Sequence, residues 1–547
     1  MSLLAMLACG KSEEEPPPPV PPQPIVLSSI TIDGVPLTDS YYGAAVQPLF
    51  RARFSGPLLP STVAAAVQLT NAGGQTQVVQ TTLESNDSVL IIRPAQPLAW
   101  LSKYKLVIGN SLKSASGGNF STIVNKSLLT RVDPTPKFPL ISDEALLDLV
   151  QQQHFRYFWE GAHPVSGLAR ERSNSGDLVT TGGSGFGIMA MLAAVERGFI
   201  TRAEALQRLQ TITGFLQTRA TTYHGAFAHW INGSTGATIP FSTKDNGADL
   251  VETSFLIMGL ISAREYFDEN NSGETALRNA INQLADAVEW DFFRKDGGPD
   301  LYWHWSPDYQ WEMNMPIRGW NECLVTYLLA ASSKTQAIPV ASYASGWAAN
   351  GNNGFLNGAD YEGITLPLGP AYGGPLFFAH YSFLGIDPNG LKDQYASYDI
   401  QNKAHAEINH RFCIRNPNNH YGYSDSVWGL TASDIPGGYT ASSPTNDQGV
   451  IAPTAALSSL PYTPEASMKA LHYFYYTLGD KLWKEYGFVD AFRLEDPWFA
   501  DSFLAIDQGP IIVMTENYRS GLLWKLFSGA PEIKAALKKL GFSAPYL

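Results

Sequence analysis

The sequence is poor in charge and in cysteine, and it has no long apolar run. Charged residues make up 16% of the 547 residues, and the formal net charge is −13. Because a nucleic-acid partner requires a basic surface, this balance argues against one. The three cysteines, Cys9, Cys323 and Cys413, are too few for a disulfide framework and lack metal-site spacing, so we expect no metal. No run approaches the ~20 apolar residues of a membrane-spanning helix.

Aromatic residues, by contrast, are plentiful. They reach 12% of the chain, with 13 Trp and 25 Tyr. Together with the low charge, this content favours an extracytoplasmic, sugar-handling surface over a cytosolic one. At 547 residues the chain is also too long for one ordinary domain.

The N-terminus resembles the end of a bacterial lipoprotein signal. Ser2–Ala8 is a short apolar stretch that ends in a small residue before Cys9, and Glu13–Glu15 resemble the acidic tract that sends such lipoproteins to the surface of some Gram-negative bacteria. The stretch is short for a signal and lacks basic residues, so an ordinary disordered N-terminus is the alternative. We expect Cys9 to be lipidated, giving a periplasmic or cell-surface lipoprotein of the outer membrane whose only membrane contact is the lipid.

Composition then predicts two domains. Residues 1–24 end in a Pro-rich tether that cannot pack a core. Residues 25–132 carry short runs of β-branched and aromatic residues, separated by turn signals such as Asp33-Gly34. This pattern predicts a small all-β immunoglobulin-like sandwich, followed by a linker at 133–140. The β region holds no cluster of titratable groups, so we expect it to be a spacer or docking module.

From residue 141 to 547 the apolar periodicity is helical. Many helices joined by long loops imply antiparallel pairs, and six pairs closed in a ring would form an all-α (α/α)6 toroid with apolar inner helices. The long loops would then gather at one end, where function concentrates. The helices are expected at about 143–160, 182–197, 201–219, 247–267, 273–293, 317–333, 373–385, 394–415, 450–460, 463–485, 508–527 and 530–541.

Residues 244–262 combine three carboxylates with an apolar run. Asp245, Asp249 and Glu252 follow spacings of four and three, which place them on one stripe of a helix. Like charges at these spacings repel, so helix stability does not explain them. Either the acids line a water-filled cleft at the mouth of a buried helix, or Asp245 caps the helix and the other two favour its positive end.

Residues 302–322 form a loop that mixes aromatic rings with hydrogen-bonding groups. Flat apolar faces and polar partners together suit saccharides, and an aromatic mini-core under a long loop is the alternative. The rings are Trp303, Trp305, Tyr309, Trp311 and Trp320, and the polar groups are His304, Asp308, Arg318 and Asn321.

Two further acids stand alone among apolar residues. Glu322 opens the helix that we expect to begin near Pro316, and apolar neighbours would raise its pKa to suit a general acid. Asp507 is the only formal charge in Phe503–Met514, where it either caps a helix or serves as a cleft acid. Glycoside hydrolysis requires two carboxylates flanking the scissile bond.

Other motifs are weaker. Gly182–Gly187 fits no nucleotide-binding pattern and is interpreted as a turn that allows close approach to a helix start. Arg170–Asp177 either lines the cleft or forms an internal ion-pair loop. The pairs His224 with His229 and His405 with His410 are more typical of structural histidines than of zinc ligands.

Several short motifs of the helical region occur in a fixed order. They are Ser175–Val179 with Thr181–Gly187, Val195–Thr201, Asp245–Ser254, Trp305–Asp308, Trp320–Glu322, Gly374–Ser382, Trp428–Asp434, Pro453–Ala456, Ala505–Pro510 and Glu516–Tyr518. Together they resemble glycoside hydrolase family 144, the bacterial "glucoamylase-like" proteins that include β-1,2-glucan hydrolases. The resemblance covers about residues 141–545 and leaves out the tether and the β domain.

The resemblance implies an (α/α)6 toroid, inverting cleavage of β-1,2-glucan to sophorose or short sophorooligosaccharides, and no cofactor. It implies that Glu322 and Asp507 supply the general acid and base, in an order left open, and that Asp245, Asp249 and Glu252 support them. The substrate-binding residues expected from the motifs and the aromatic loop are Arg172, Asp177, Trp303, His304, Trp305, Asp308, Trp311, Arg318, Asn321, His380, Trp428, Gln508 and Tyr518.

The combined expectation is a monomeric glycoside hydrolase with a β-glucan substrate. The alternatives are another toroid enzyme, such as an exo-acting glucosidase or a phosphorylase, and a non-catalytic surface glycan-binding lipoprotein. A polysaccharide lyase would need basic residues around a uronate substrate, and the acids and rings argue against it.

Overall fold

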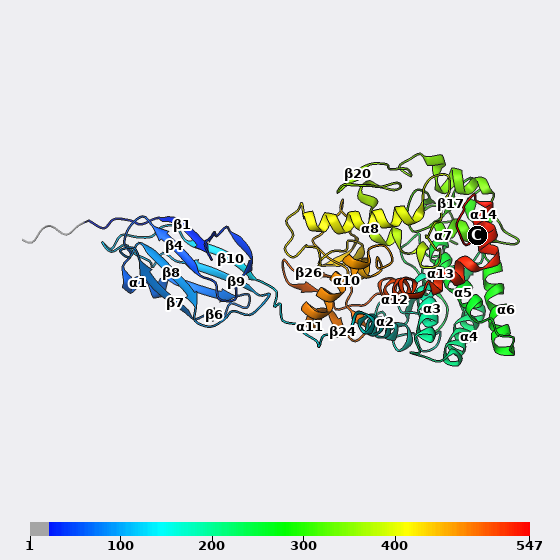
Figure 1. The fold of residues 1–547 in the computed structure, drawn as a ribbon, viewed down its shortest axis with the longest axis horizontal. Coiled ribbons are helices and arrows are strands. Elements are labelled where there is room, and N and C mark those ends of the chain that lie inside the picture. Colours follow the sequence, from blue (N-terminus) through cyan, green and yellow to red (C-terminus); the bar gives the residue numbers. More distant parts are fainter. Residues whose placement is uncertain (1–20) are drawn as a thin grey trace, which may run out of the picture. The chain divides into compact units, whose positions relative to one another are not determined.

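The computed structural model describes residues 21–547, which divide into two compact units between Asp133 and Pro134 (Figure 1). The expected lipidation site, Cys9, lies outside the described residues. Within the described part of the chain, the helices are all too short or too polar to cross a membrane.

The first unit is built from two five-stranded sheets. In β4, buried residues alternate with exposed ones, so that Phe50, Ala52 and Phe54 face a shared apolar core. A short helix of 7 residues, α1 (Pro60–Ala66), precedes β5. One sheet has the order β2 (Val35–Pro36), β1 (Leu27–Ile32), β4 (Phe50–Phe54), β8 (Val89–Pro94), β7 (Val79–Glu84); the other has the order β3 (Ser40–Ala44), β10 (Val124–Thr130), β9 (Lys103–Ile108), β5 (Val67–Asn71), β6 (Thr76–Gln77).

The second unit is mainly helical. Helices α3 and α5 are buried along nearly their whole length, because they are apolar on every side. Helices α4 and α6 expose one polar face. The helices are α2 (Asp143–Trp159), α3 (Thr181–Glu196), α4 (Arg202–Thr218), α5 (Leu250–Tyr266), α6 (Ser272–Asp286), α7 (Leu324–Ser332), α8 (Tyr398–Arg415), α9 (Pro453–Leu457), α10 (Pro464–His472), α11 (Gly479–Leu482), α12 (Ala505–Ser520), α13 (Leu522–Gly529) and α14 (Pro531–Lys539).

Glycines let α3 and α5 touch along their backbones. A Cβ on Gly185 would lie 2.1 Å from the carbonyl oxygen of Phe255, and a Cβ on Gly259 would lie 2.3 Å from the carbonyl oxygen of Gly185. No side chain fits in either place. The Gly-rich segment 182–187 is therefore helical and not the expected turn, although its glycines do allow a close approach.

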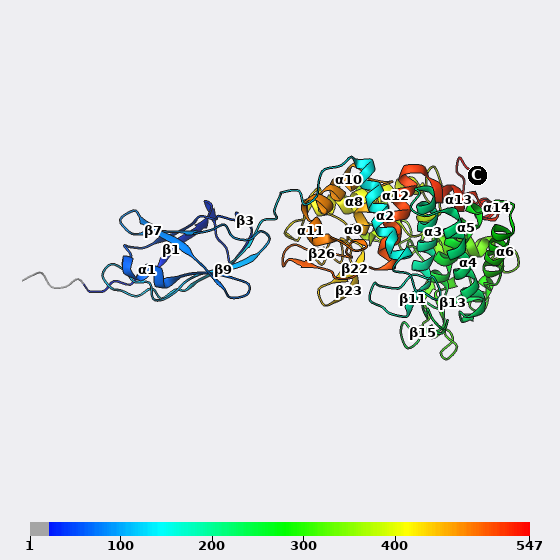
Figure 2. The same cartoon turned by 90° about the horizontal axis from the view of Figure 1, so that it is seen from below.

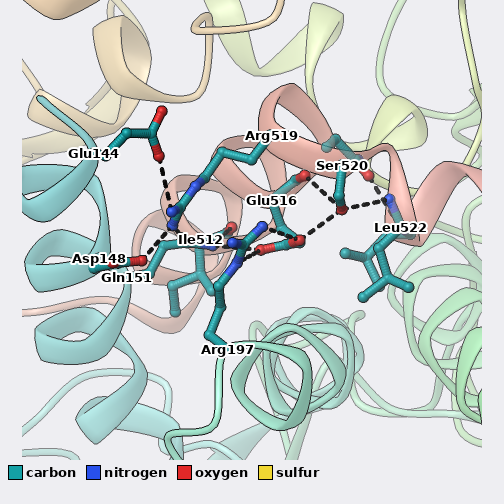
Figure 3. Close-up of polar contacts among 11 residues, drawn as sticks. Glu144, Asp148, Gln151, Arg197, Ile512, Glu516, Arg519, Ser520 and Leu522 are labelled. Atoms are coloured by element: carbon teal, nitrogen blue, oxygen red, sulfur yellow. Dashed lines mark hydrogen bonds and ion pairs between the residues drawn. The ribbon is translucent and has the colours of Figure 1, made fainter.

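Ion pairs bind α2, α3 and α12 at one end (Figure 3). The guanidinium of Arg197 donates to both carboxylate oxygens of Glu516, each at 2.7 Å, and Gln151 Nε2 donates to the same carboxylate at 3.1 Å. Arg519 at the end of α12 pairs with Asp148 of α2. Because these residues lie near the start of α2 but the end of α3 and α12, α2 runs antiparallel to both.

Short strands gather along the opposite side of the helical unit (Figure 2). They come from the long connections that precede the buried helices, so the loops do collect at one end of the helices. The strands are β11 (Leu178–Thr180), β13 (Ala226–Phe227), β14 (Trp230–Asn232), β15 (Thr238–Ile239), β16 (Ala248–Asp249), β18 (His304–Trp305), β22 (Ala432–Ile435) and β23 (Gly438–Ala441).

Several expected helices are wrong in extent. The helix expected at 273–293 ends at Asp286, the one expected at 450–460 covers only Pro453–Leu457, and the one expected at 508–527 is split into α12 and α13 at Gly521, whose φ is +69°. The helix expected from residue 317 begins at Leu324, because Pro316 and Ile317 pair as strand β19 and Gly319 has a φ of +88°. The segment 373–385 forms 3-10 turns, since Gly373 and Gly374 have positive φ. The segment 463–485 is broken by a π-helical turn over 473–477.

We expect Gly185→Ala to lower the free energy of unfolding of the helical unit by at least about 1–3 kcal/mol, because its Cβ meets backbone that cannot move away. The matched control is Gly214→Ala in α4, where a Cβ meets nothing within 4 Å. That change should raise stability by roughly 0.5–1 kcal/mol through helix propensity. Urea denaturation of both variants measures the difference, and equal effects would contradict the close packing of α3 on α5.

Candidate active site

A cavity of about 410 Å³ opens at the end of the unit where the buried helices begin. Its walls combine aromatic rings with three acids. Rings and acids together suit a saccharide, but of the loop 302–322 that was expected to supply them only Trp303 and Glu322 line the cavity. The rings are Trp230, Phe241, Phe255, Trp303, Phe377, Tyr381 and Tyr439, and the acids are Glu171, Glu252 and Glu322.

Asp249 and Glu252 are held by helix N-termini. Asp249 caps α5, since its Oδ1 accepts from the N–H groups of Val251 and Glu252 at 3.0 and 2.9 Å. Asp245, proposed as the cap from sequence, lies before the cap. Glu252 Oε2 accepts from the N–H of Gly182 at 2.8 Å, which is in the first turn of α3. A Cβ on Gly182 would lie 2.4 Å from that oxygen, so a larger residue would displace the Glu252 carboxylate.

Two histidines neutralise these acids. His229 Nδ1 lies 3.1 Å from Asp249 Oδ2, and His304 Nε2 lies 3.3 Å from Asp245 Oδ2. Burial alone would lower the pKa of His229, but the carboxylates of Glu252 and Asp249 outweigh it and raise the pKa to about 9. The pKa of His304 is also raised, by Asp245 and Asp249 against burial. At neutral pH the imidazole of His229 therefore carries a positive charge.

The same cluster is where a metal ion could be held. One ligand atom each from His229, Asp245 and Asp249 lies within 4.8 Å of the others. The same carboxylates lie within ion-pair distance of His229 and His304, so the histidines and a metal ion would compete for them.

Glu322 lies in the turn before α7, and contacts from distant segments fix that turn. Ser382 donates to the backbone carbonyl of Glu322 and accepts from the N–H of Val325 at 3.0 Å, so it caps α7 from outside. Asn321 accepts from Cys323 N at 3.0 Å and from Trp347 Nε1 at 3.2 Å. Burial, with help from the carboxylates of Glu252 and Asp249, raises the pKa of Glu322 to about 7.

Asp507 occupies the first turn of α12 and is almost fully buried. Its backbone carbonyl accepts from Thr454 Oγ1 at 2.9 Å. Burial and the neighbouring Asp490 raise its pKa well above the usual range. Beside it, Arg172 lines the cavity and forms ion pairs with Glu171 at 3.0 Å and Asp434 at 3.2 Å. The 170–177 loop therefore both lines the cavity and forms ion pairs, so both interpretations that the sequence left open apply to it.

The aromatic loop divides between the cavity and a separate cluster. Trp303 lines the cavity, whereas Trp305 and Trp311 both pack against Phe292, at 5.8 and 5.3 Å between ring centroids. Binding of substrate by these two tryptophans stays a prediction. Asp308 accepts from Asn246 Nδ2 at 2.7 Å.

Several other residues expected to bind substrate are occupied elsewhere. Arg318 pairs with Asp300, and Asn321 holds the turn that carries Glu322. Gln508 is buried and donates to the carbonyl of Phe488. Asp177 is exposed and pairs with His163, and Tyr518 is exposed near the end of α12, far along the helix from Asp507.

For Trp428 and His380 the structure contradicts the prediction. Trp428 is fully buried, and its indole N–H donates to the carbonyl of Ala466. His380 is 2% exposed, hydrogen-bonds to Ser459 Oγ at 3.0 Å and stacks on Tyr462. Burial lowers the pKa of His380 to about 3, so it is a neutral core histidine. Both belong to the packing of the core.

Sequence reasoning missed other residues at the cavity. The sequence predicts a structural role for His229, because its spacing from His224 does not fit a zinc site. Asp490 stands between Val489 and Ala491 as a lone acid in an apolar segment, the same signal that found Asp507. Tyr381 and Tyr439 had no signal, since single tyrosines are common in loops.

The chain is similar to known proteins in both of its units. A family model described as "Putative glucoamylase" matches residues 314–531, and a bacterial Ig-like domain model matches residues 30–127. A crystal structure from Bacteroides uniformis with the same glucoamylase description is 55% identical; the match covers 75% of this chain and 100% of that chain, with a TM-score of 0.74. The endo-β-1,2-glucanase of Chitinophaga pinensis is 50% identical, with coverages of 75% and 100% and a TM-score of 0.72.

The chain belongs to glycoside hydrolase family 144. Another relative, the exo β-1,2-glucooligosaccharide sophorohydrolase (non-reducing end) of Parabacteroides distasonis, is 44% identical over 471 residues, which is 81% of this chain. The chain spans 65% of that relative's length. The membership in family 144 rests on matches that contain the helical unit and its cavity.

The raised pKa of Glu322 predicts that the free energy of unfolding depends on pH. A carboxyl whose pKa rises from 4.5 to about 7 on folding stabilises the fold below its unfolded pKa, and this contribution is lost as pH rises through 7. At about 1.4 kcal/mol per pH unit, Glu322→Gln should gain roughly 3 kcal/mol over wild type between pH 4 and pH 8. Denaturation at several pH values measures this gain. The exposed Glu160→Gln is the control and should show no gain at high pH; a pH-independent difference for Glu322→Gln would contradict the raised pKa.

Proposed function

We propose that this protein hydrolyses β-1,2-linked glucan and releases sophorose or short sophorooligosaccharides. The observation that carries the proposal is Glu322: a buried carboxyl group whose pKa of about 7 keeps a proton available at neutral pH, in a cavity lined by aromatic rings. The support for the linkage comes from the relatives, which include an endo-β-1,2-glucanase and an exo-acting sophorohydrolase.

The mechanism we propose is inverting and uses two carboxyl groups. Glu322 donates a proton to the glycosidic oxygen as the bond to the anomeric carbon breaks. A water on the other face of the sugar attacks that carbon and gives up a proton on the side of Asp507. Tyr381, which lines the cavity, supports this pairing: burial raises the pKa of its hydroxyl, and the charges of Asp507 and Glu322 both add to the rise, so both acids lie near it.

The apolar rings supply the binding surface in this proposal. Trp303 and Trp230 offer flat faces for the C–H groups of glucose rings, and the ion pairs around Arg172 offer polar partners for hydroxyls. Asp249 and Glu252 act indirectly: their negative charge raises the pKa of Glu322 and so keeps it protonated.

We also propose that the helical unit is an (α/α)6 toroid. Buried α3 and α5 would belong to the inner ring, and α4 and α6, each with a polar face, to the outer ring. Helix α12 packs against α2 and α3, so the last buried helix returns to the first pair, as closure of a ring requires. An experimental structure with an open helical array would overturn this assignment.

Chromatography of products from linear β-1,2-glucan tests the function. Wild type should release short sophorooligosaccharides, and Glu322→Gln should lose about 10²–10⁴-fold in kcat because the amide cannot donate the proton. Glu160→Gln, a matched change in an exposed pair with Arg156, should keep full activity.

The products also separate the alternatives. Early products of mixed length indicate endo action, and sophorose alone indicates exo action. Dependence on added phosphate would indicate a phosphorylase. An inert wild type that still binds the glucan would favour a binding protein, and full activity of Glu322→Gln would overturn the acid assignment.

We further propose that the protein is a monomer held at the outer membrane by a lipid on Cys9. The support is the apolar stretch before this cysteine and the acidic tract after it. Expressed in a Gram-negative host behind a complete signal sequence, the chain should enter the detergent-rich phase of a Triton X-114 extract. Cys9→Ser should move it to the aqueous phase, and Ser12→Ala should not. Wild type in the aqueous phase would contradict lipidation.

A further inference from the structure

Asp490 is a buried acid beside Asp507 that the mechanism above does not use. It lies in the turn between β25 (Gly487–Phe488) and β26 (Phe492–Arg493), and it is 2% exposed. Its backbone N–H donates to the carbonyl of Ser502, and its Oδ2 accepts from the backbone N–H of Asp434 at 2.6 Å. The side chain is therefore held in place from two sides.

Each of the two acids has a buried oxygen without a hydrogen-bond donor. Asp490 Oδ1 and Asp507 Oδ2 are both buried, and among residues 21–547 no N–H or O–H donor reaches either of them. The two carboxyl groups are nevertheless within hydrogen-bonding distance of one another. Two carboxylate oxygens can hydrogen-bond only if a proton lies between them, because ionised carboxylates only accept.

The charge around the pair favours one proton and no more than one negative charge. Burial and mutual repulsion oppose two ionised carboxylates side by side. Arg172 is the cation of this neighbourhood, and its two ion pairs already engage it. The other titratable groups that act on the pair are Glu171, Asp434, Tyr381 and Tyr439.

A protonated Asp507 poses a problem for the proposed reaction. A carboxyl group that already holds a proton cannot act as a base at the same oxygen. The base must then use its second oxygen and pass the first proton on. Asp490 is the group in contact that can receive it.

We propose that Asp490 and Asp507 share one proton, and that Asp490 receives this proton when Asp507 takes a proton from the attacking water. The proposal rests on the proposed function. In the step, the water oxygen bonds to the anomeric carbon, the glycosidic bond breaks, and Glu322 gives its proton to the leaving oxygen. The water's proton goes to Asp507, and the shared proton goes to Asp490. The pair ends with two protons and Glu322 with none, so product release is followed by return of one proton to Glu322. Asp490 is thus a positioning residue that acts through Asp507.

Asp490→Asn tests the role of Asp490 in turnover. The amide oxygen keeps the hydrogen bond from Asp434 N, and the amide N–H₂ can donate to Asp507, which should then ionise. We expect kcat at neutral pH to fall about tenfold or more, because the resulting base is weaker, with KM nearly unchanged. We also expect the acidic limb of the kcat profile to move by about one pH unit or more to lower pH, because the pair no longer takes up a second proton.

The pH profile separates this role from a structural one. A variant that only loosens the fold loses activity by the same factor at every pH, and that result would overturn the proposal, as would unchanged kinetics. Glu516→Gln is the matched control: it alters an equally buried carboxylate in the ion pairs of Figure 3, and it should leave the acidic limb in place.

Infrared spectroscopy tests the shared proton without requiring activity. The wild-type protein at pH 7 should show the C=O stretch of a buried protonated carboxyl group that is absent from both Asp490→Asn and Asp507→Asn. Equal bands in all three proteins would overturn the shared proton, whatever the activity. If the band behaves as expected but wild type cleaves no glucan, the proposed function fails and the shared proton stands.

Discussion

The starts of four buried or partly buried helices meet at one cavity, and the rest of the site depends on this convergence. The carboxylate of Glu252, from α5, lies at the start of α3, and Asp249 caps α5 itself. Glu322 precedes α7, and Asp507 lies in the first turn of α12. Helix N-termini offer free N–H groups and a partial positive charge, which offset the cost of burying carboxylates. Acids can therefore be kept in an apolar cavity, where their pKa values move apart.

Much of this site could be predicted from the sequence because its acids leave a local signal. A lone carboxylate in an apolar run, as at Glu322 or Asp507, is costly to bury, so its presence points to a use. Helical periodicity likewise predicted α2–α5 to within about three residues at each end, since their apolar faces are continuous. The glycines at the start of α3 predicted a close approach of another segment, but not that this segment is α5.

The remainder depends on contacts between residues far apart in the chain. Ser382 fixes the turn of Glu322, and Asp490 meets Asp507, and neither pairing follows from spacing. The aromatic residues were the weakest guide, because Trp428 in the core and Trp303 at the cavity look alike in sequence. The helix expected from residue 317 was predicted too long because a strand pair and a glycine interrupt it. Tertiary contacts there override the local helix propensity.

Helix α12 carries acid–base chemistry at its first turn and a cross-helix ion-pair network at its last turns. Asp507 and Glu516 are nine positions apart, or about 14 Å along the axis. Changes separated by more than about 7–10 Å usually combine additively. Substitutions around Glu516 can thus change thermal stability, and substitutions around Asp507 the pH range of catalysis, without affecting each other. The two properties can evolve, or be engineered, separately.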